Sequence, residues 1–297
     1  MSDGTGFSAD DRSAKRDALS RLRDAVSSFV QNQSTAPLDP SPAVAELRSF
    51  ARQESLETAQ AQTWPLLEVA SDQLTAFVKT ITEPVEAMAP YTCTRSLLEA
   101  AALACWLLDP SIDTRTRVGR SVALRHEGLM QQVKWARAAG QDSAYAQRRV
   151  DHVVATAAKM GYPPVVDVRG RSIGAGQRMP SGTEIIGLML EEEPLYRLLS
   201  AVAHGHHWAR QQLSFERAPA FDRVSDVSGA RLAGVTKAAN LTSFAMLVLT
   251  AAVSLSRAAW YQGRYVGWDT NALCAILDAR FDSLGATTSV RFWRPAA

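Results

Sequence analysis

Cysteine is scarce in this sequence and shows no paired spacing. The 297 residues include Cys93, Cys105 and Cys274, without a C-x-x-C motif. An odd number of widely separated cysteines favours free thiols over a disulfide framework. The first residues carry acids and lack an apolar core, which argues against a signal peptide. We therefore expect a cytoplasmic protein with reduced cysteines.

Several motifs that would name a reaction are also missing. No G-x-S-x-G serine motif is present, and the glycine-rich stretch 170–176 lacks the lysine of a phosphate-binding loop. The histidines form neither an E-x-x-H nor an H-E-x-x-H pattern, so we expect no metal and no cofactor. The net charge is only +2, which excludes a strongly basic surface over the whole chain.

One long stretch, 238–256, contains no charged residue. Its 19 residues lie at the lower length limit for a membrane span, and they include polar residues such as Asn240, Thr242 and Ser254. The stretch therefore predicts a buried central helix of a soluble bundle, and no membrane partner is expected.

Apolar residues make up 46% of the chain and recur mostly at helical spacing, whereas the alternation typical of strands is almost absent. We predict an all-α fold, a multi-helix bundle of about eight to ten helices with one long irregular loop at 161–182. Residues 1–40 are expected to form a peripheral helix and a linker, and residues 41–297 a single helical-bundle domain. The predicted helices include residues 43–62, 113–139, 194–215 and 230–261.

Charge is distributed unevenly along the chain. Residues 1–90 carry 8 basic and 13 acidic side chains, whereas residues 91–182 carry 13 basic and 7 acidic ones. We therefore expect an anionic partner, either RNA or an anionic small molecule, to meet the middle third.

A row of polar side chains is predicted on the segment 194–211. At helical spacing Tyr196, Ser200, His204, His207 and Gln211 fall in one arc, opposite an apolar face. An imidazole titrates near neutral pH, so His204 is the candidate acid/base. Tyr196 and Ser200 are candidate catalytic neighbours, and His207 is a candidate for substrate binding.

A second set of charges lies in the apolar helix before residue 109. Arg95 and Glu99 are one turn apart and share a face with Trp106. In the following helix Arg115 falls within the apolar arc, and a buried arginine requires a carboxylate. We therefore predict a contact of Arg115 with Glu99, directly or through Arg95. We also predict that four residues bind substrate: Arg95, Glu99, Trp106 and Arg115.

Two other arginines of the helix at 113–139, Arg117 and Arg120, lie opposite the apolar arc and are expected to face solvent. The polar sets on three helices allow two interpretations. They can line one catalytic pocket, or they can form a buried network that fixes how the helices pack.

The pattern Arg95-x3-Glu99 followed by Tyr196-x3-Ser200-x3-His204-Gly205 resembles a family of uncharacterised all-helical proteins common in actinobacteria. Arg197-x6-His204 is similar to the R-x4–6-H signature of HEPN-domain ribonucleases. That resemblance implies metal-independent action on RNA at the interface of a homodimer, with Arg197 and His204 as catalytic residues. Arg120 and His126 form a second match to the spacing.

Three functions follow as hypotheses. The first is a HEPN-like helical protein acting on RNA by acid/base catalysis. The second is an enzyme or binder of a small molecule, with a pocket of Tyr, Ser, His, Glu and Arg side chains. The third is a non-catalytic interaction scaffold.

Overall fold

The structure is a computed structural model that describes residues 9–33, 36–81, 86, 88–212, 216–224, 231–236 and 241–283. Its helices are α1 (Ala9–Gln31), α2 (Pro42–Ser49), α3 (Gln53–Ala61), α4 (Thr63–Thr80), α5 (Ala89–Leu108), α6 (Thr114–Ala138), α7 (Ala144–Lys159), α8 (Gly182–Leu190), α9 (Glu193–Ala203), α10 (His207–Gln212), α11 (Leu241–Val266) and α12 (Thr270–Ser283). The predicted all-α multi-helix bundle is confirmed.

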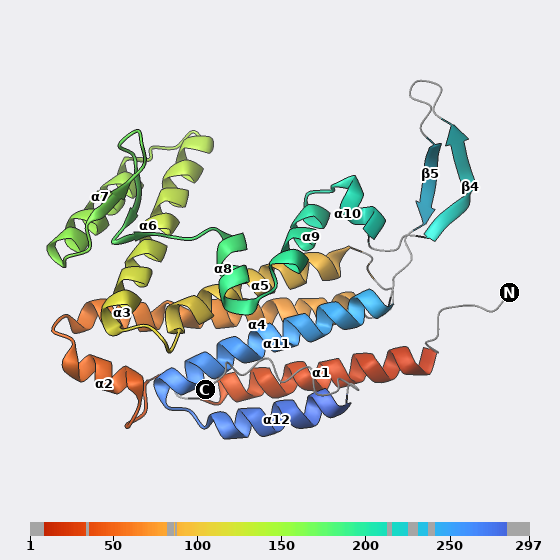
Figure 1. The fold of residues 1–297 in the computed structure, drawn as a ribbon, viewed down its shortest axis with the longest axis horizontal. Helices are drawn as coiled ribbons and strands as arrows, with labels where there is room; N and C mark the ends of the chain where they lie inside the picture. Colours follow the sequence, from red (N-terminus) through yellow and green to blue (C-terminus); the bar gives the residue numbers. More distant parts are fainter. Residues whose placement is uncertain are drawn as a thin grey trace.

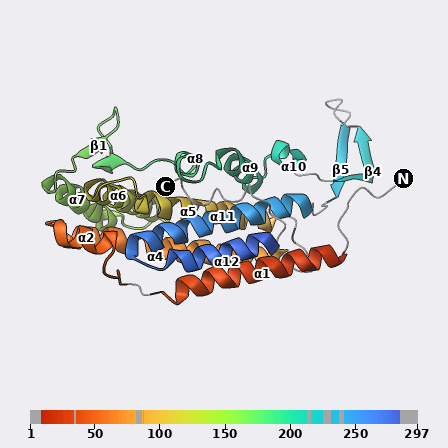
Figure 2. The ribbon, with the colours of Figure 1, turned by 60° about the horizontal axis from the view of Figure 1, so that its bottom comes forward.

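The long helices α1, α4, α5, α11 and α12 run side by side and form the body of the bundle (Figures 1 and 2). Helices α6 and α7 form an antiparallel pair at one end, and α8 and α9 lie along α5. Helix α1 packs against α4, α11 and α12 and buries Leu22 and Val26 in the main core. The division of the chain at residue 40 stays a prediction.

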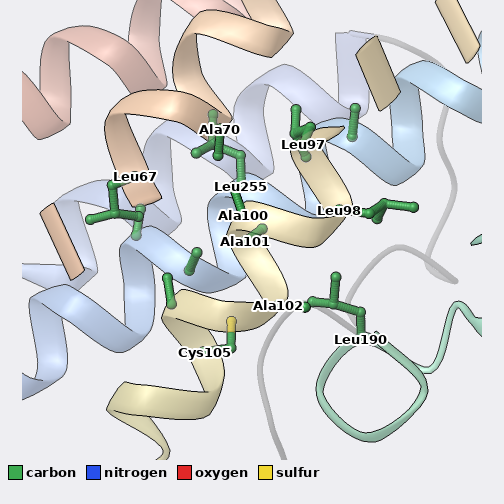
Figure 3. Packing of buried hydrophobic residues seen from close by; sticks show 14 of the residues in the cluster. Leu67, Ala70, Leu97, Leu98, Ala100, Ala101, Ala102, Cys105, Leu190 and Leu255 are labelled. Atoms are coloured by element: carbon green, nitrogen blue, oxygen red, sulfur yellow. The ribbon is translucent and has the colours of Figure 1, made fainter. Parts of the chain in front are cut away.

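Helix α5 is the centre of this core because one side is covered by α4 and α11 and another by α8 and α9. Ala100, Ala101, Ala102 and Ala104 are all buried on it, and small side chains let neighbouring helices approach closely. Figure 3 shows Leu255 of α11 beside Ala100 and Ala101.

The predicted helix 43–62 is divided into α2 and α3. Helix α2 begins as the sequence indicates, with the Ser41 side chain accepting a hydrogen bond from the Val44 amide at 3.3 Å. It ends at Phe50, whose backbone is extended. The Phe50 side chain packs on a small core around Leu56, away from the main core. Tertiary packing therefore breaks a segment that is locally compatible with one helix.

The segment 161–182 is the predicted long connection, and it also contains three short strands. These are β1 (Pro164–Val166), β2 (Ser172–Ala175) and β3 (Gln177–Arg178), which form an antiparallel sheet in this order. Gly170 and Gly176 have φ values of 72° and 74° at the two turns, a conformation that favours glycine. Strand β2 packs against α6 and α7, which fixes the sheet on this end of the bundle.

A second antiparallel pair, β4 (Glu216–Val224) and β5 (Arg231–Thr236), precedes α11. The helix predicted over 230–261 is therefore wrong at its start, because α11 begins at Leu241. Strand pairing joins Glu216 to Thr236, and such a non-local partner is invisible to helical periodicity.

The charge-free stretch behaves as expected where it is described. In α11 it buries Leu247, Ala251 and Leu255 in the main core. Among the described residues no helix has the length and the apolar character needed to cross a bilayer.

Stability should fall at alkaline pH because of a buried thiol. Burial raises the pKa of Cys105 on α5 from 9.0 to about 12. The unfolded chain then loses this proton near pH 9 and the folded chain near pH 12. The contribution of Cys105 to the free energy of unfolding is therefore complete below pH 9 and is lost as the pH rises to 12. We expect the urea midpoint to fall over this range.

The variant Cys105→Ala should lose less stability between pH 9 and pH 11 than the wild type. Part of the alkaline decrease in stability should persist in Cys105→Ala, because burial also raises the pKa of Tyr261 to about 12. Equal alkaline losses in the two proteins would contradict the role of Cys105.

Candidate functional site

The helix predicted across 194–211 is not continuous. It ends at Ala203, and the chain resumes as α10 at His207. Gly205 has a φ of 71°, and the following amide of His206 donates to the Ala201 carbonyl at 2.9 Å. This is a glycine-terminated helix end, so Gly205 itself is the stop signal that the helical-wheel interpretation overlooked.

The predicted polar arc is therefore interrupted after its third member. Tyr196 and Ser200 lie on α9 and His204 caps it, whereas His207 and Gln211 belong to α10. Tyr196 is buried, Ser200 is half-buried, and His204 is exposed. Exposure to solvent therefore increases along α9 from Tyr196 to His204.

The structure does bring Tyr196 together with the charged pair on α5. The Tyr196 hydroxyl donates to Glu99 Oε1 at 2.7 Å, and Arg95 Nε donates to the same oxygen at 3.1 Å. The Arg95 guanidinium also lies 5.7 Å from the centre of the Tyr196 ring. Three of the residues selected from the sequence thus form one hydrogen-bonded cluster between α5 and α9.

The cluster combines a buried phenol with a partly accessible carboxylate. Burial and the hydrogen bond to Glu99 raise the pKa of Tyr196, which therefore stays protonated as a donor. The side chain of Glu99 is 37% exposed and can accept further hydrogen bonds from outside. A methyl group on Gly182, the first residue of α8, would lie 3.1 Å from the Tyr196 hydroxyl, so α8 closes one side of the cluster.

Replacing Tyr196 with phenylalanine should lower the free energy of unfolding by about 1 kcal/mol, because one hydrogen bond is lost and the half-exposed Glu99 can turn to water. Urea unfolding would measure the change. Tyr145→Phe is the matched control, since Tyr145 is exposed and should change stability little. Equal stability of Tyr196→Phe and wild type would contradict a net contribution from this bond.

The predicted contact between Arg115 and Glu99 is wrong. Arg115 is exposed, its Nη2 donates to the Gly161 carbonyl at 2.8 Å, and its guanidinium stacks 5.0 Å from the Tyr162 ring. Arg115 therefore attaches the end of α7 to α6 and does not join the cluster on α5.

Trp106 packs against Arg120 of α6. Its indole is buried, and the guanidinium of Arg120 lies 5.2 Å from the indole ring centre. Arg120 also pairs with Asp109 at 3.2 Å and is largely buried, so its predicted exposure to solvent is wrong. The pair ties the end of α5 to α6.

The buried arginine of α6 is Arg117, so its predicted exposure to solvent is wrong. Its side chain is 4% exposed and pairs with Glu46 of α2, with Nε 3.3 Å from Oε2. It also donates to the Leu107 carbonyl and lies 4.3 Å from the Tyr265 ring centre. A buried arginine of α6 does pair with a carboxylate, as predicted, but this arginine is Arg117 and not Arg115.

Exposed imidazoles gather where α9 meets α10. His204, His206 and His207 are all exposed, and the ring centres of the first two are 6.3 Å apart. Arg197 lies two turns before His204 on α9 and pairs with Glu193 at 2.8 Å. The described residues contain no group of three or more His, Cys, Asp or Glu side chains able to hold a metal ion.

No known protein family, curated protein or solved structure matches this chain. The resemblance to an actinobacterial family and to HEPN ribonucleases therefore stays a prediction.

Proposed function

We propose that the protein acts on RNA by metal-independent acid/base catalysis at the corner between α9 and α10. His204 takes the proton from the RNA 2′-hydroxyl as its oxygen bonds to phosphorus, the P–O5′ bond breaks, and the proton passes to the leaving 5′-oxygen. Arg197 stabilises the negative charge on the phosphate. The observation that carries this proposal is an exposed imidazole at the end of α9 with an arginine about 10 Å earlier on the same helix.

The surroundings of His204 suit a polymeric substrate. A catalytic group for a long chain must be accessible, and His204, His206 and His207 are exposed. Trp208 follows them and is 50% exposed, and aromatic and imidazole rings offer stacking surfaces for unpaired bases. A homodimer of the kind that the HEPN resemblance implies would bring two such corners together.

Arg197 can exchange its present partner for a phosphate. Its ion pair with Glu193 is exposed, since the two side chains are 64% and 46% accessible. Exposed pairs contribute little stability, so an RNA phosphate can compete for the guanidinium.

The test is incubation of purified protein with total RNA in the presence of EDTA, comparing wild type with His204→Ala. We expect cleavage by the wild type and its loss in the variant. Identical RNA profiles would remove the nuclease proposal. RNA affinity should also fall steeply as salt is added, because binding releases counterions from the phosphates.

The alternative function is binding or conversion of a small molecule at the cluster of Arg95, Glu99 and Tyr196. It is favoured by the hydrogen bond between the phenol and the partly exposed carboxylate. A neutral ligand held there should bind with little dependence on salt, which distinguishes this function from RNA binding.

A further inference from the structure

A cavity of about 570 Å³ lies between α6, the small sheet and the first turn of α8, and its lining includes no residue of the corner between α9 and α10. Its size falls in the range of small-molecule sites. The polar part of its wall comes from His126, Lys134, Arg171, Ser172 and Arg178, and the apolar part from Met130, Ile173 and Met179.

A buried histidine forms the inner part of this wall. His126 is 1% exposed, and its Nε2 lies 2.8 Å from the Ser172 hydroxyl oxygen. Its Nδ1 has no hydrogen-bond partner among the described residues. His126 and Ser172 both line the cavity, so their hydrogen-bonded pair presents the Ser172 hydroxyl to a group that binds there. Burial lowers the pKa of His126, which keeps the ring neutral.

The rim of the cavity is positively charged. Lys134 has no carboxylate within 4 Å in the described part of the chain. Arg171 pairs with Asp167 and Arg178 with Glu184, but both arginine side chains are more than half exposed and can reach a ligand. The acid in the wall, Glu127, accepts a hydrogen bond from the Gln131 side chain.

We propose that this cavity binds an organic phosphate monoester. Lys134 and Arg178 face the phosphate, the Ser172 hydroxyl donates a hydrogen bond to it while accepting one from His126 Nε2, and the organic part packs on Met130. A phosphate offers three acceptor oxygens to such a set of donors, and charge-assisted bonds to it are strong. The inference goes beyond the proposed action on RNA, because none of these residues belongs to the corner between α9 and α10.

Isothermal titration with phenyl phosphate, benzoate and inorganic phosphate tests the proposal at low salt. Phenyl phosphate combines the anion with an apolar ring, so it should bind about tenfold tighter than either other compound. Absence of phenyl phosphate binding would overturn the proposal. Equal binding of benzoate would overturn the preference for a phosphate, and equal binding of inorganic phosphate would overturn the organic subsite.

Two variants place the binding in this cavity. Lys134→Gln and Ser172→Ala should each weaken phenyl phosphate binding roughly tenfold, because each removes one contact to the anion. Lys79→Gln on α4 is the matched control for an exposed lysine and should bind like wild type. Unchanged binding in both test variants, with their thermal midpoints intact, would overturn the assignment. His204→Ala should bind normally, so this result is separable from the RNA proposal.

Discussion

Replacing Arg117 with alanine lowers the free energy of unfolding by about 3–5 kcal/mol, because it leaves the carboxylate of Glu46 largely buried without its cation. The same carboxylate accepts a hydrogen bond from the Tyr265 hydroxyl at 2.6 Å, so three helices depend on one charge pair. The substitution also removes the donor to the Leu107 carbonyl at the end of α5. Urea unfolding would measure the loss.

Arg115→Ala is the matched control, since it makes the same chemical change two residues earlier on α6. Arg115 is exposed and bonds a single carbonyl, so its removal should lower the free energy of unfolding by about 1 kcal/mol. A comparable decrease in the free energy of unfolding for the two variants, or a larger decrease for Arg115→Ala, would contradict the placement of Arg117 in the core.

The variant His204→Ala should cleave RNA about 10²–10⁴-fold more slowly than wild type, because it removes the proposed acid/base group. Stability should change little, since the side chain is exposed at the end of α9. Rate constants from single-turnover cleavage with EDTA present would measure the effect.

His152→Ala on α7 is the control for a histidine deletion at an exposed site. It should cleave RNA at the wild-type rate, because His152 lies on a different helix from the proposed site. Equal rates for His204→Ala and wild type would contradict the role of His204. A loss in both variants would show that the cleavage does not depend on this corner.

Local signals in the sequence were sufficient to predict most helices and several of their ends. Asp113 caps α6 by accepting from the Thr116 amide at 2.7 Å, and Ser181 and Glu184 form a capping box at α8. Gly140 follows α6 with a φ of 66°. These contacts join residues a few positions apart, so the sequence carries them directly.

One part of the cluster of Arg95, Glu99 and Tyr196 was also accessible from the sequence, for a related reason. Arg95 and Glu99 are one turn apart, so their ion pair follows from helix geometry. Their meeting with Tyr196 depends on the packing of α9 against α5, which helical spacing does not determine. The hydrogen bond of 2.7 Å joins the two helices, and the role of these residues in a functional site stays a prediction.

Only the tertiary structure decided which arginine of α6 is buried. Arg115 and Arg117 lie on different sides of the helix, and the choice depended on α2 and α11, which bring Glu46 and Tyr265 to the side of Arg117. The pairing of His126 with Ser172 depends in the same way on β2 packing against α6. Residues on one helix share a fixed geometry, so periodicity predicts their relative positions. Partners distant in the sequence meet only through packing, and periodicity carries no information about which elements pack together.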